Sequence, residues 1–328
     1  MCLAAMTIHS SIGESRGADL VHQYGCFQWM MPGHVVGTFC RVIVEFFYLA
    51  SNAIKKPRVS TEGCVSIVLV PKGFSPIDHM WTEIQYRFLR LIAPRVPTTM
   101  GGGAYTGKSK LQVCCPGIEA AIRDKVVLDF GCGPGMEVTE MAVLGAKRTI
   151  GLDISSKWLH LAREQIERAG VAAKCEFVTS VNSLVEVIVS LDCFEHFDEP
   201  DAVLQKMYAV LEPGGEVFIS FGPTWYHPLG GHLFSVFPWA HIMLEEQALV
   251  RWRSQFKNDG ATKFREVEGG LNQMTIRRFE DILPFQVEEF ELVPIRRFRL
   301  LHNRLTRELL TAIVRCRLRK PTVVANIP

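Results

Sequence analysis

The chain has 328 residues, of which 48% are hydrophobic and 21% charged, and its formal net charge is +2 at pH 7. This composition is that of an ordinary globular protein and excludes a disordered chain, and the small net charge gives no reason to expect nucleic acid as a partner. The 10 cysteines form no C-x-x-C pair and no Cys/His ligand spacing. We therefore expect no metal site, and reduced thiols favour a cytoplasmic location.

Residues 1–100 contain no motif and are interpreted as an N-terminal extension of unknown role. The most apolar run, 35–50, is interrupted by charged residues, and about 20 apolar residues are needed to span a bilayer. No transmembrane span is expected, although contact with a membrane surface stays open. The aromatic segment 81–92 predicts an amphipathic helix that packs over the later domain and is ended by prolines.

Residues 102–109 match the phosphate-binding pattern Gly-x4-Gly-Lys-Ser letter for letter. That motif requires a strand before it and a helix after it. Prolines precede the segment, and Pro116-Gly117 cuts the next one short. Binding of a nucleotide triphosphate is therefore only the third-ranked function, and a flexible loop at the mouth of a pocket is the favoured interpretation.

Residues 126–135, Val-Val-Leu-Asp-Phe-Gly-Cys-Gly-Pro-Gly, are the most informative stretch. The apolar run predicts a strand, and glycines at alternate positions predict a tight turn that lets a ligand approach the backbone. The helix predicted at 136–144 would direct free N–H groups at that ligand. A dinucleotide fingerprint would place its third glycine at Met136, so the spacing argues against NAD.

Strands and helices alternate regularly from about residue 118, which predicts a parallel, doubly wound sheet. The predicted strands are 126–130, 148–153, 175–179, 185–191 and 215–221, and the predicted helices are 136–144, 156–169 and 200–211. Ser155 or Ser156 is expected to cap the second helix and Gly170 to end it. After an irregular stretch, 223–274, the sequence predicts a helix at 275–283, a strand at 285–293, a helix at 300–310 and a strand at 312–318.

The acid two residues before Gly-x-Gly-x-Gly resembles the first motif of class I S-adenosylmethionine (SAM) dependent methyltransferases. The resemblance extends over 110–320, including the final helix and pair of strands. It implies an α/β, Rossmann-like, doubly wound and mostly parallel seven-stranded sheet with an antiparallel last strand. The N-terminal extension and an insertion after strand five, 223–274, are additions to that fold. The resemblance also implies SAM as the cofactor.

Ligands of such sheets lie at the carboxyl ends of the strands. The resemblance assigns Asp129 to orienting the glycine loop and Asp153 to the ribose hydroxyls. No acid follows the third strand, where many family members bind the adenine amino group, so Ser180 or Asn182 would make that contact. The predicted cofactor-binding set is Asp129, Gly131, Cys132, Gly133, Gly135, Asp153, Ile154, Ser180, Asn182, Ser190 and Asp192.

Three histidines are candidate catalytic residues. His196 stands in a segment, 190–197, that is similar to the Glu-His segment of ubiquinone-biosynthesis O-methyltransferases, and a base role and a structural role are equal alternatives for it. His227 and His232 follow strand five, where they are placed to recognise an acceptor or to remove its proton. A hydrophobic lid with incidental histidines explains them equally well.

The predicted function is transfer of a methyl group from SAM to a small-molecule acceptor, at an oxygen, nitrogen or carbon that the sequence leaves open. The insertion 223–274 is predicted to be a substrate lid. Its basic residues Arg251, Arg253 and Lys257 either pair with an acidic substrate or contact only solvent. The alternative function, motivated by the missing acid after strand three, is a methyltransferase-fold protein that holds SAM without catalysis. The sequence predicts no oligomeric state.

Overall fold

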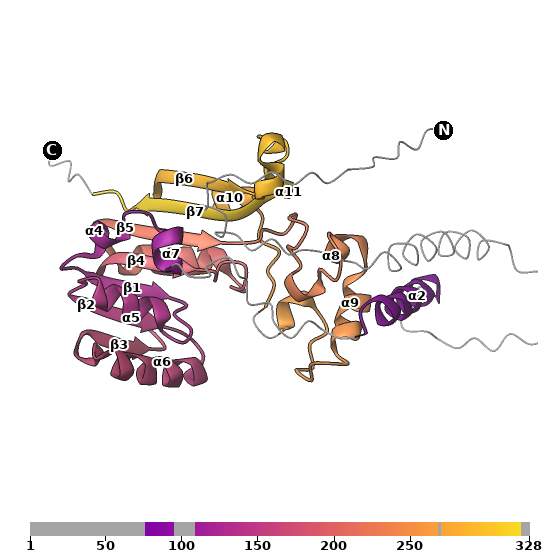
Figure 1. The fold of residues 1–328 in the computed structure, drawn as a ribbon, viewed down its shortest axis with the longest axis horizontal. Coiled ribbons are helices and arrows are strands. Elements are labelled where there is room, and N and C mark those ends of the chain that lie inside the picture. The colour runs from indigo at the N-terminus through magenta and orange to yellow at the C-terminus, as the bar shows by residue number, and fades with distance from the viewer. Residues whose placement is uncertain (1–75, 95–108, 268–269, 323–328) are drawn as a thin grey trace, which may run out of the picture.

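The computed structural model of the protein describes residues 76–94, 109–267 and 270–322 (Figure 1). Its centre is a seven-stranded sheet with the order β3-β2-β1-β4-β5-β7-β6. The parallel strands are β1 (Val126–Phe130), β2 (Arg148–Leu152), β3 (Cys175–Val178), β4 (Val185–Leu191) and β5 (Leu211–Phe221). Strand β7 (Thr311–Arg319) is antiparallel to both of its neighbours, β5 and β6 (Gln286–Pro294). The predicted sheet with its antiparallel last strand is confirmed.

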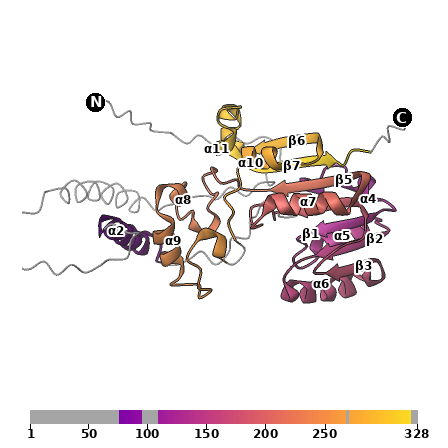
Figure 2. The same cartoon turned by 180° about the vertical axis from the view of Figure 1, so that it is seen from behind.

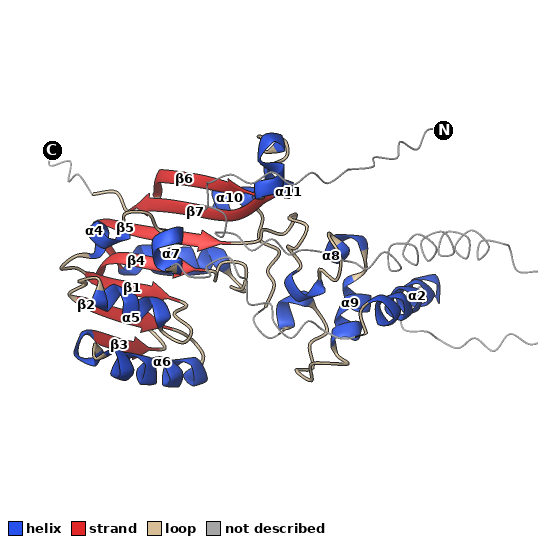
Figure 3. Cartoon of the chain, viewed as in Figure 1, coloured by secondary structure: helices blue, strands red, loops and turns tan. Residues whose placement is uncertain are grey.

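Helices cover both faces of the sheet (Figure 3), and successive residues of β1 face two different cores. Val127 shares a core with residues of α3 (Lys110–Cys114), α4 (Ile118–Ile122) and α5 (Met136–Val143). Leu128 shares the other core with residues of α7 (Pro200–Val210) and α10 (Ile276–Ile282). Helix α6 (Ser156–Ala169) packs against β3. The predicted doubly wound arrangement is therefore confirmed.

Most predicted element boundaries agree with the structure, and the caps explain why. Strands β1 and β4 and helix α6 begin and end where the sequence predicts. Ser155 caps α6, because its hydroxyl accepts a hydrogen bond from the Trp158 N–H at 3.4 Å, and Gly170 ends the helix with φ +69°. Strand β5 begins four residues before the predicted Gly215, and its register with β4 shifts between Val185 and Val187.

The helix predicted at 300–310 is wrong. The structure has a 3₁₀ segment, η5 (Arg296–Leu301), and a single helical turn, α11 (Arg307–Leu310), with a turn between them. The Asn303 side chain accepts from the Leu305 N–H at 2.9 Å, and the Thr306 hydroxyl donates to the Leu301 carbonyl at 2.6 Å. Short polar side chains of this kind compete with helical hydrogen bonds, so the apolar spacing does not produce a continuous helix.

A second, smaller core joins the N-terminal part to the insertion. It contains residues of α2 (Pro76–Ile92), η3 (His232–Phe234), α9 (Glu246–Arg253) and η4 (Phe264–Glu266), and α8 (Ala240–Met243) lies between η3 and α9 in the chain. Helix α2 packs on α9, and the fully buried Trp252 donates its indole N–H to the Ala93 carbonyl at 2.8 Å. Figures 1 and 2 show α2, α8 and α9 beyond the carboxyl ends of the parallel strands. The predicted helix 81–92 is confirmed, although it begins at Pro76, and it packs on the insertion.

Two of the three basic residues considered for an acidic substrate are paired with carboxylates of the chain. Arg251 pairs with Glu83 of α2 at 2.7 Å, and its guanidinium lies 3.9 Å from the centroid of the Tyr86 ring. Arg253 is buried and makes two hydrogen bonds to Asp259, at 2.8 and 2.6 Å. Arginine is suited to such two-point pairing with carboxylates. The pairs of Arg251 and Arg253 join parts of the second core, and Lys257 also has a partner. Contact with solvent alone is therefore wrong for Arg251 and Arg253, and pairing with an acidic substrate stays a prediction.

We expect Trp252→Ala to destabilise this second core without weakening cofactor binding. Removing a fully buried aromatic side chain costs about 3–5 kcal/mol, and the glycine loop lies in a different hydrophobic cluster. Hydrogen exchange of the α2 amides should accelerate, while the affinity for S-adenosylhomocysteine stays unchanged. Met243→Ala, at a side chain that is 69% exposed, is the control. Equal protection of α2 in both variants would contradict the packing described here.

Two sequence features fall outside the described residues, namely the apolar run 35–50 and 102–108 of the phosphate-binding pattern. The last residue of that pattern, Ser109, caps α3, because its hydroxyl accepts a hydrogen bond from the Gln112 N–H at 3.1 Å. Among the described helices, none combines the length and the apolar character needed to cross a bilayer.

Candidate active site

The glycine loop is tied to the end of β2. The N–H groups of Gly131 and Cys132 both donate to the Leu152 carbonyl, at 2.8 and 3.0 Å. Gly131, Gly133 and Gly135 all have positive φ, as predicted. A Cβ on Gly135 would lie 2.8 Å from the Ala162 Cβ of α6, so this glycine also permits close packing of the loop on that helix. The loop backbone is therefore held at the edge where a ligand of the sheet would lie.

We expect Gly131→Ala to destabilise the fold clearly more than Gly170→Ala. Both positions have positive φ, but a Cβ on Gly131 would lie 2.7 Å from the Cys193 Sγ, whereas nothing lies within 4 Å at Gly170. Backbone strain alone costs about 1 kcal/mol, and overpacking adds roughly 1–3 kcal/mol. Chemical denaturation of the two variants measures the difference, and equal losses would show that Cys193 moves away freely.

Asp153 links the glycine loop to the start of α6. Its Oδ2 accepts the Gly133 N–H at 2.9 Å, and its Oδ1 accepts the Ser155 N–H at 2.8 Å. A carboxylate oxygen can accept more than one hydrogen bond, so both oxygens can still receive ribose hydroxyls. The neighbouring Ile154 side chain is 94% exposed. Ribose binding by Asp153 stays a prediction, and the geometry fits it.

Asp129 of β1 and Lys110 of α3 interact electrostatically next to the glycine loop. Asp129 is buried, and its Oδ2 has no hydrogen-bond partner among the described residues. Burial, followed by the negative charge of Glu137, raises its pKa well above the usual range. The Lys110 amine lies 3.0 Å from Glu137 and 3.5 Å from Asp192. Burial opposes the charge of Lys110, but Glu137, Asp192 and Asp129 outweigh it and raise the pKa of the amine.

The other predicted cofactor-binding residues differ in how far their side chains are exposed. Ser180 and Asn182 are exposed after β3, where a side-chain oxygen can meet a ligand. The Cys132 side chain is buried in the cluster between α5 and α6, which leaves its backbone for the ligand. The Ser190 hydroxyl is buried and donates to the Phe130 carbonyl at 2.9 Å, a bond between β4 and β1. Asp192, with φ +55°, follows β4 beside Lys110.

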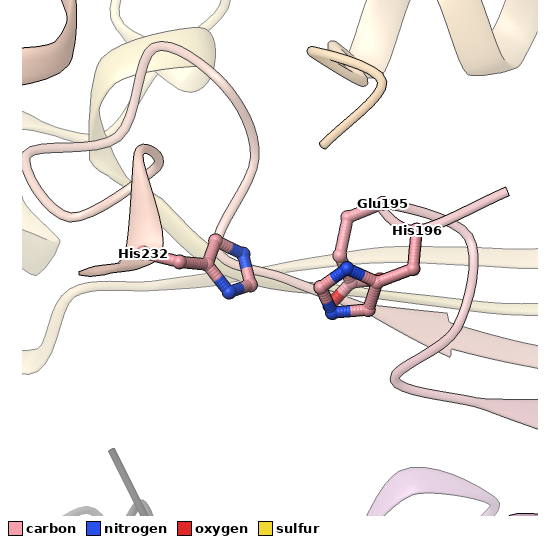
Figure 4. Close-up of side chains that lie close together, drawn as sticks. All are labelled: Glu195, His196 and His232. Atoms are coloured by element: carbon pink, nitrogen blue, oxygen red, sulfur yellow. The ribbon is translucent and has the colours of Figure 1, made fainter. Parts of the chain in front are cut away.

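Two of the three predicted catalytic histidines lie together. His196, from the loop after β4, and His232, from the insertion, have ring centroids 5.2 Å apart. The His196 Nδ1 is hydrogen-bonded to the Gly270 carbonyl at 2.9 Å. Glu195 completes a cluster in which one ligand atom from each residue lies within 4.8 Å of the others (Figure 4). Sequence reasoning missed Glu195 as a site residue, although it stands in the segment that carries the resemblance.

The cluster contains buried polar atoms without partners. Glu195 Oε2 and His232 Nε2 are buried and accept or donate no hydrogen bond among the described residues. Such atoms cost roughly 1–3 kcal/mol each. Burial, and then Asp192, raises the pKa of Glu195 to about 8. Burial, and then His196, lowers the pKa of His232 to about 3, so this imidazole is neutral at pH 7 and a poor proton acceptor.

His227 has a different environment. Its Nδ1 accepts the Leu229 N–H at 3.0 Å, so the ring stabilises a turn of the insertion. Burial lowers the pKa of His227 to about 4. The structure does not bring His227 into the cluster of Glu195, His196 and His232. A catalytic role for His227 stays a prediction, and the geometry favours His196.

Comparison with known proteins agrees with this geometry. The sequence profile of a family described as "Methyltransferase domain" matches residues 128–219, which include the glycine loop, Asp153 and the Glu-His segment. Residues 128–219 therefore belong to a methyltransferase domain. Its fold and its cofactor, SAM, are those that the sequence predicts. The match ends before His232 and does not include the insertion.

Two curated relatives of the methyltransferase domain are named "Ubiquinone biosynthesis O-methyltransferase". The protein from Cupriavidus pinatubonensis is 33% identical over 107 residues, which cover 31% of this chain and 43% of the relative. The protein from Pseudomonas aeruginosa strain LESB58 is 34% identical over 107 residues, which cover 31% of this chain and 46% of the relative. The chain thus spans less than half the length of these relatives.

A solved structure from Listeria monocytogenes, titled as a putative S-adenosylmethionine dependent methyltransferase, is 15% identical with a TM-score of 0.40. The match covers 64% of this chain and 96% of the Listeria chain. A likeness of this degree adds nothing to the functional argument.

Proposed function

We propose that the protein transfers a methyl group from SAM to a small-molecule acceptor. The observation that carries the proposal is the arrangement at one edge of the sheet. The glycine loop and Asp153 follow β1 and β2, and Glu195 and His196 follow β4, the neighbour of β1 on its other side. In a sheet of this kind the ligand lies across those strand ends. A cofactor held by the loop would therefore present its reactive end toward the histidine cluster.

The chemistry needs alignment more than covalent help from the protein. A lone pair on the acceptor forms the new bond to the methyl carbon, and the electrons of the broken C–S bond stay on sulfur, which becomes a neutral thioether. Holding the two atoms in line and excluding water supplies most of the acceleration. When the acceptor atom is a hydroxyl oxygen, its proton must leave. His196 is the candidate base, because its Nδ1 is engaged with Gly270 and its other nitrogen faces the cluster.

The insertion 223–274 is proposed as the lid over the acceptor. Two observations support this role. The insertion follows β5 at the carboxyl ends of the strands, and it supplies His232 to the cluster. Its second core, shared with α2, gives the lid hydrophobic packing of its own. No observation on the described residues favours nucleic acid as the acceptor. Location in the cytoplasm stays a prediction.

Calorimetric titration with SAM and S-adenosylhomocysteine tests cofactor binding, and transfer of a labelled methyl group tests catalysis. The purified full chain would be incubated with methyl-labelled SAM and a panel of small phenols, amines and carboxylates, or with a cell extract. Labelled product from one acceptor class supports the proposal. Absence of binding at millimolar SAM would overturn it.

A protein that binds SAM without catalysis is the second candidate. The exposed Ser180 and Asn182 and the lack of an acid after β3 favour it, because adenine would then be held by weaker contacts. SAM binding without labelled product from any extract or acceptor would select this candidate over the enzyme.

A further inference from the structure

The strongest feature that methyl transfer does not require is the cluster of Glu195, His196 and His232. Each residue offers one ligand atom, and the three atoms lie within 4.8 Å of one another. Figure 4 shows the two imidazole rings as neighbours, with the Glu195 side chain beside His196, and the ring planes are inclined at 74°. We propose that this cluster binds a divalent first-row transition-metal ion, with Zn²⁺ as the reference cation.

Two residues of the cluster each carry a buried polar atom without a partner among the described residues. Glu195 Oε2 and His232 Nε2 are both buried, and neither has a hydrogen-bond partner in the described part of the chain. Glu195 itself is only 3% exposed. Buried polar atoms are almost always paired in proteins, and unpaired ones at one place indicate a missing ion or water. Both atoms belong to the same cluster, so one bound ion would satisfy them together.

The orientation of His196 also suits a metal ligand. Its Nδ1 lies 2.9 Å from the Gly270 carbonyl, which can only accept, so Nδ1 carries the proton. The lone pair is then on Nε2. A ligating histidine typically donates its other ring N–H to a carbonyl or carboxylate in this way, which fixes both tautomer and ring orientation. Gly270, with φ +60°, places its carbonyl for that bond.

The ligand set defines the class of ion. Two imidazoles and one carboxylate suit Zn²⁺, Fe²⁺, Co²⁺ or Mn²⁺ and leave further coordination positions open. Ligand atoms around tetrahedral zinc lie roughly 3.4 Å apart, from bond lengths of about 2.0–2.1 Å. The ligand atoms, which lie within 4.8 Å of one another, would have to approach by at most about 1.4 Å, through changes in side-chain torsion angles. Asp192 is not a member, since Lys110 lies 3.5 Å from its carboxylate.

The ligands come from two parts of the chain with different origins. Glu195 and His196 lie within the stretch that matches the methyltransferase-domain family, whereas His232 lies in the insertion outside it. A bound ion would connect the lid to the end of β4. For catalysis, which rests on the proposed function, the open positions would take the acceptor hydroxyl. The ion would lower the pKa of that hydroxyl, so its proton could leave to water without His196 acting as the base, and the oxygen lone pair would form the bond to the methyl carbon.

The test measures metal binding directly, without turnover. The full chain would be stripped with a chelator and titrated with Zn²⁺ against a chromogenic indicator, and with Co²⁺ followed by its visible spectrum. We expect one equivalent to bind, with a Co²⁺ spectrum free of thiolate charge-transfer bands despite the 10 cysteines. Glu195→Gln and His232→Ala should each weaken Zn²⁺ binding by at least about 100-fold, since each removes one of three ligands.

His160→Ala is the matched control, because His160 is an exposed histidine of α6 near a carboxylate, Glu164. It should bind Zn²⁺ as the wild type does. Thermal unfolding of each variant without metal checks that the fold survives. No Zn²⁺ binding, binding that persists in both cluster variants, or a thiolate spectrum would overturn the inference. Cofactor titration is a separate readout: SAM binding without Zn²⁺ binding removes only the metal site, and Zn²⁺ binding without SAM binding removes only the proposed function.

Discussion

Asp153→Ala should weaken the binding of SAM and S-adenosylhomocysteine by roughly 5- to 150-fold. The estimate corresponds to about 1–3 kcal/mol for charge-assisted hydrogen bonds to the ribose hydroxyls. The loss has a second source, because the same carboxylate accepts the N–H groups of Gly133 and Ser155. Without it, the glycine loop loses its link to the start of α6, and part of the binding energy is spent on ordering the loop. Isothermal titration measures the affinity.

Asp153→Asn separates these two sources. Its side-chain oxygen can still accept one backbone N–H, whereas its NH₂ group cannot replace the second acceptor. We expect an intermediate affinity and a smaller loss of thermal stability without ligand than in Asp153→Ala. Asp198→Ala, an exposed position in the loop before α7, serves as the control for a lost negative charge. If Asp153→Ala binds the cofactor with wild-type affinity, the ribose site lies elsewhere.

His196→Ala should lower kcat for methyl transfer to a hydroxyl acceptor by about 10²- to 10⁴-fold, the usual contribution of a positioned acid or base. The affinity for S-adenosylhomocysteine should stay unchanged, because His196 lies beyond the methyl end of the proposed cofactor position. His196 is favoured over His232, since burial holds the pKa of His232 at about 3. The measurement is single-turnover transfer of labelled methyl to the best acceptor from the panel.

His160→Ala provides the control for this variant as well, because its exposed ring lies on α6. An equal fall in cofactor affinity and in kcat/KM would show that His196 acts on the fold or on the cofactor, not on the acceptor. The base and metal-ligand roles are separated by the metal dependence of the wild type. Transfer by chelator-treated protein at the full rate identifies a base, and loss of transfer that Zn²⁺ restores identifies a ligand.

Much of the central domain was predictable because its signals are local. The apolar run from Val126 to Phe130 predicts a buried strand without any information on distant residues. The positive φ of Gly131, Gly133 and Gly135 is possible because glycine has no side chain. Ser155 and Gly170 mark the ends of α6 through bonds within a few residues. The prediction of a helix at 300–310 was wrong because Asn303 and Thr306 make local hydrogen bonds that the apolar spacing does not reveal.

The candidate site was only partly predictable. The sequence pointed to His196 and His232 separately, 36 positions apart, and gave no sign that their rings meet. Lys110 stands in a five-residue helix without a motif, 19 residues before Asp129, yet its amine lies between Glu137 and Asp192. The sequence left Arg251 and Arg253 open between an acidic substrate and solvent, because charge alone does not reveal a partner such as Glu83, which is 168 residues from Arg251.

The α/β order and the glycine loop could be predicted from the sequence, because they depend on hydrophobic period, turn residues and spacing over fewer than about 20 residues. The antiparallel closure of the sheet and the expectation of SAM came from the resemblance to methyltransferases. The packing of α2 on the insertion and the cluster of Glu195 with two histidines could be seen only in the folded chain. Burial, charge pairing and unpartnered atoms arise where distant segments meet, so no local pattern records them.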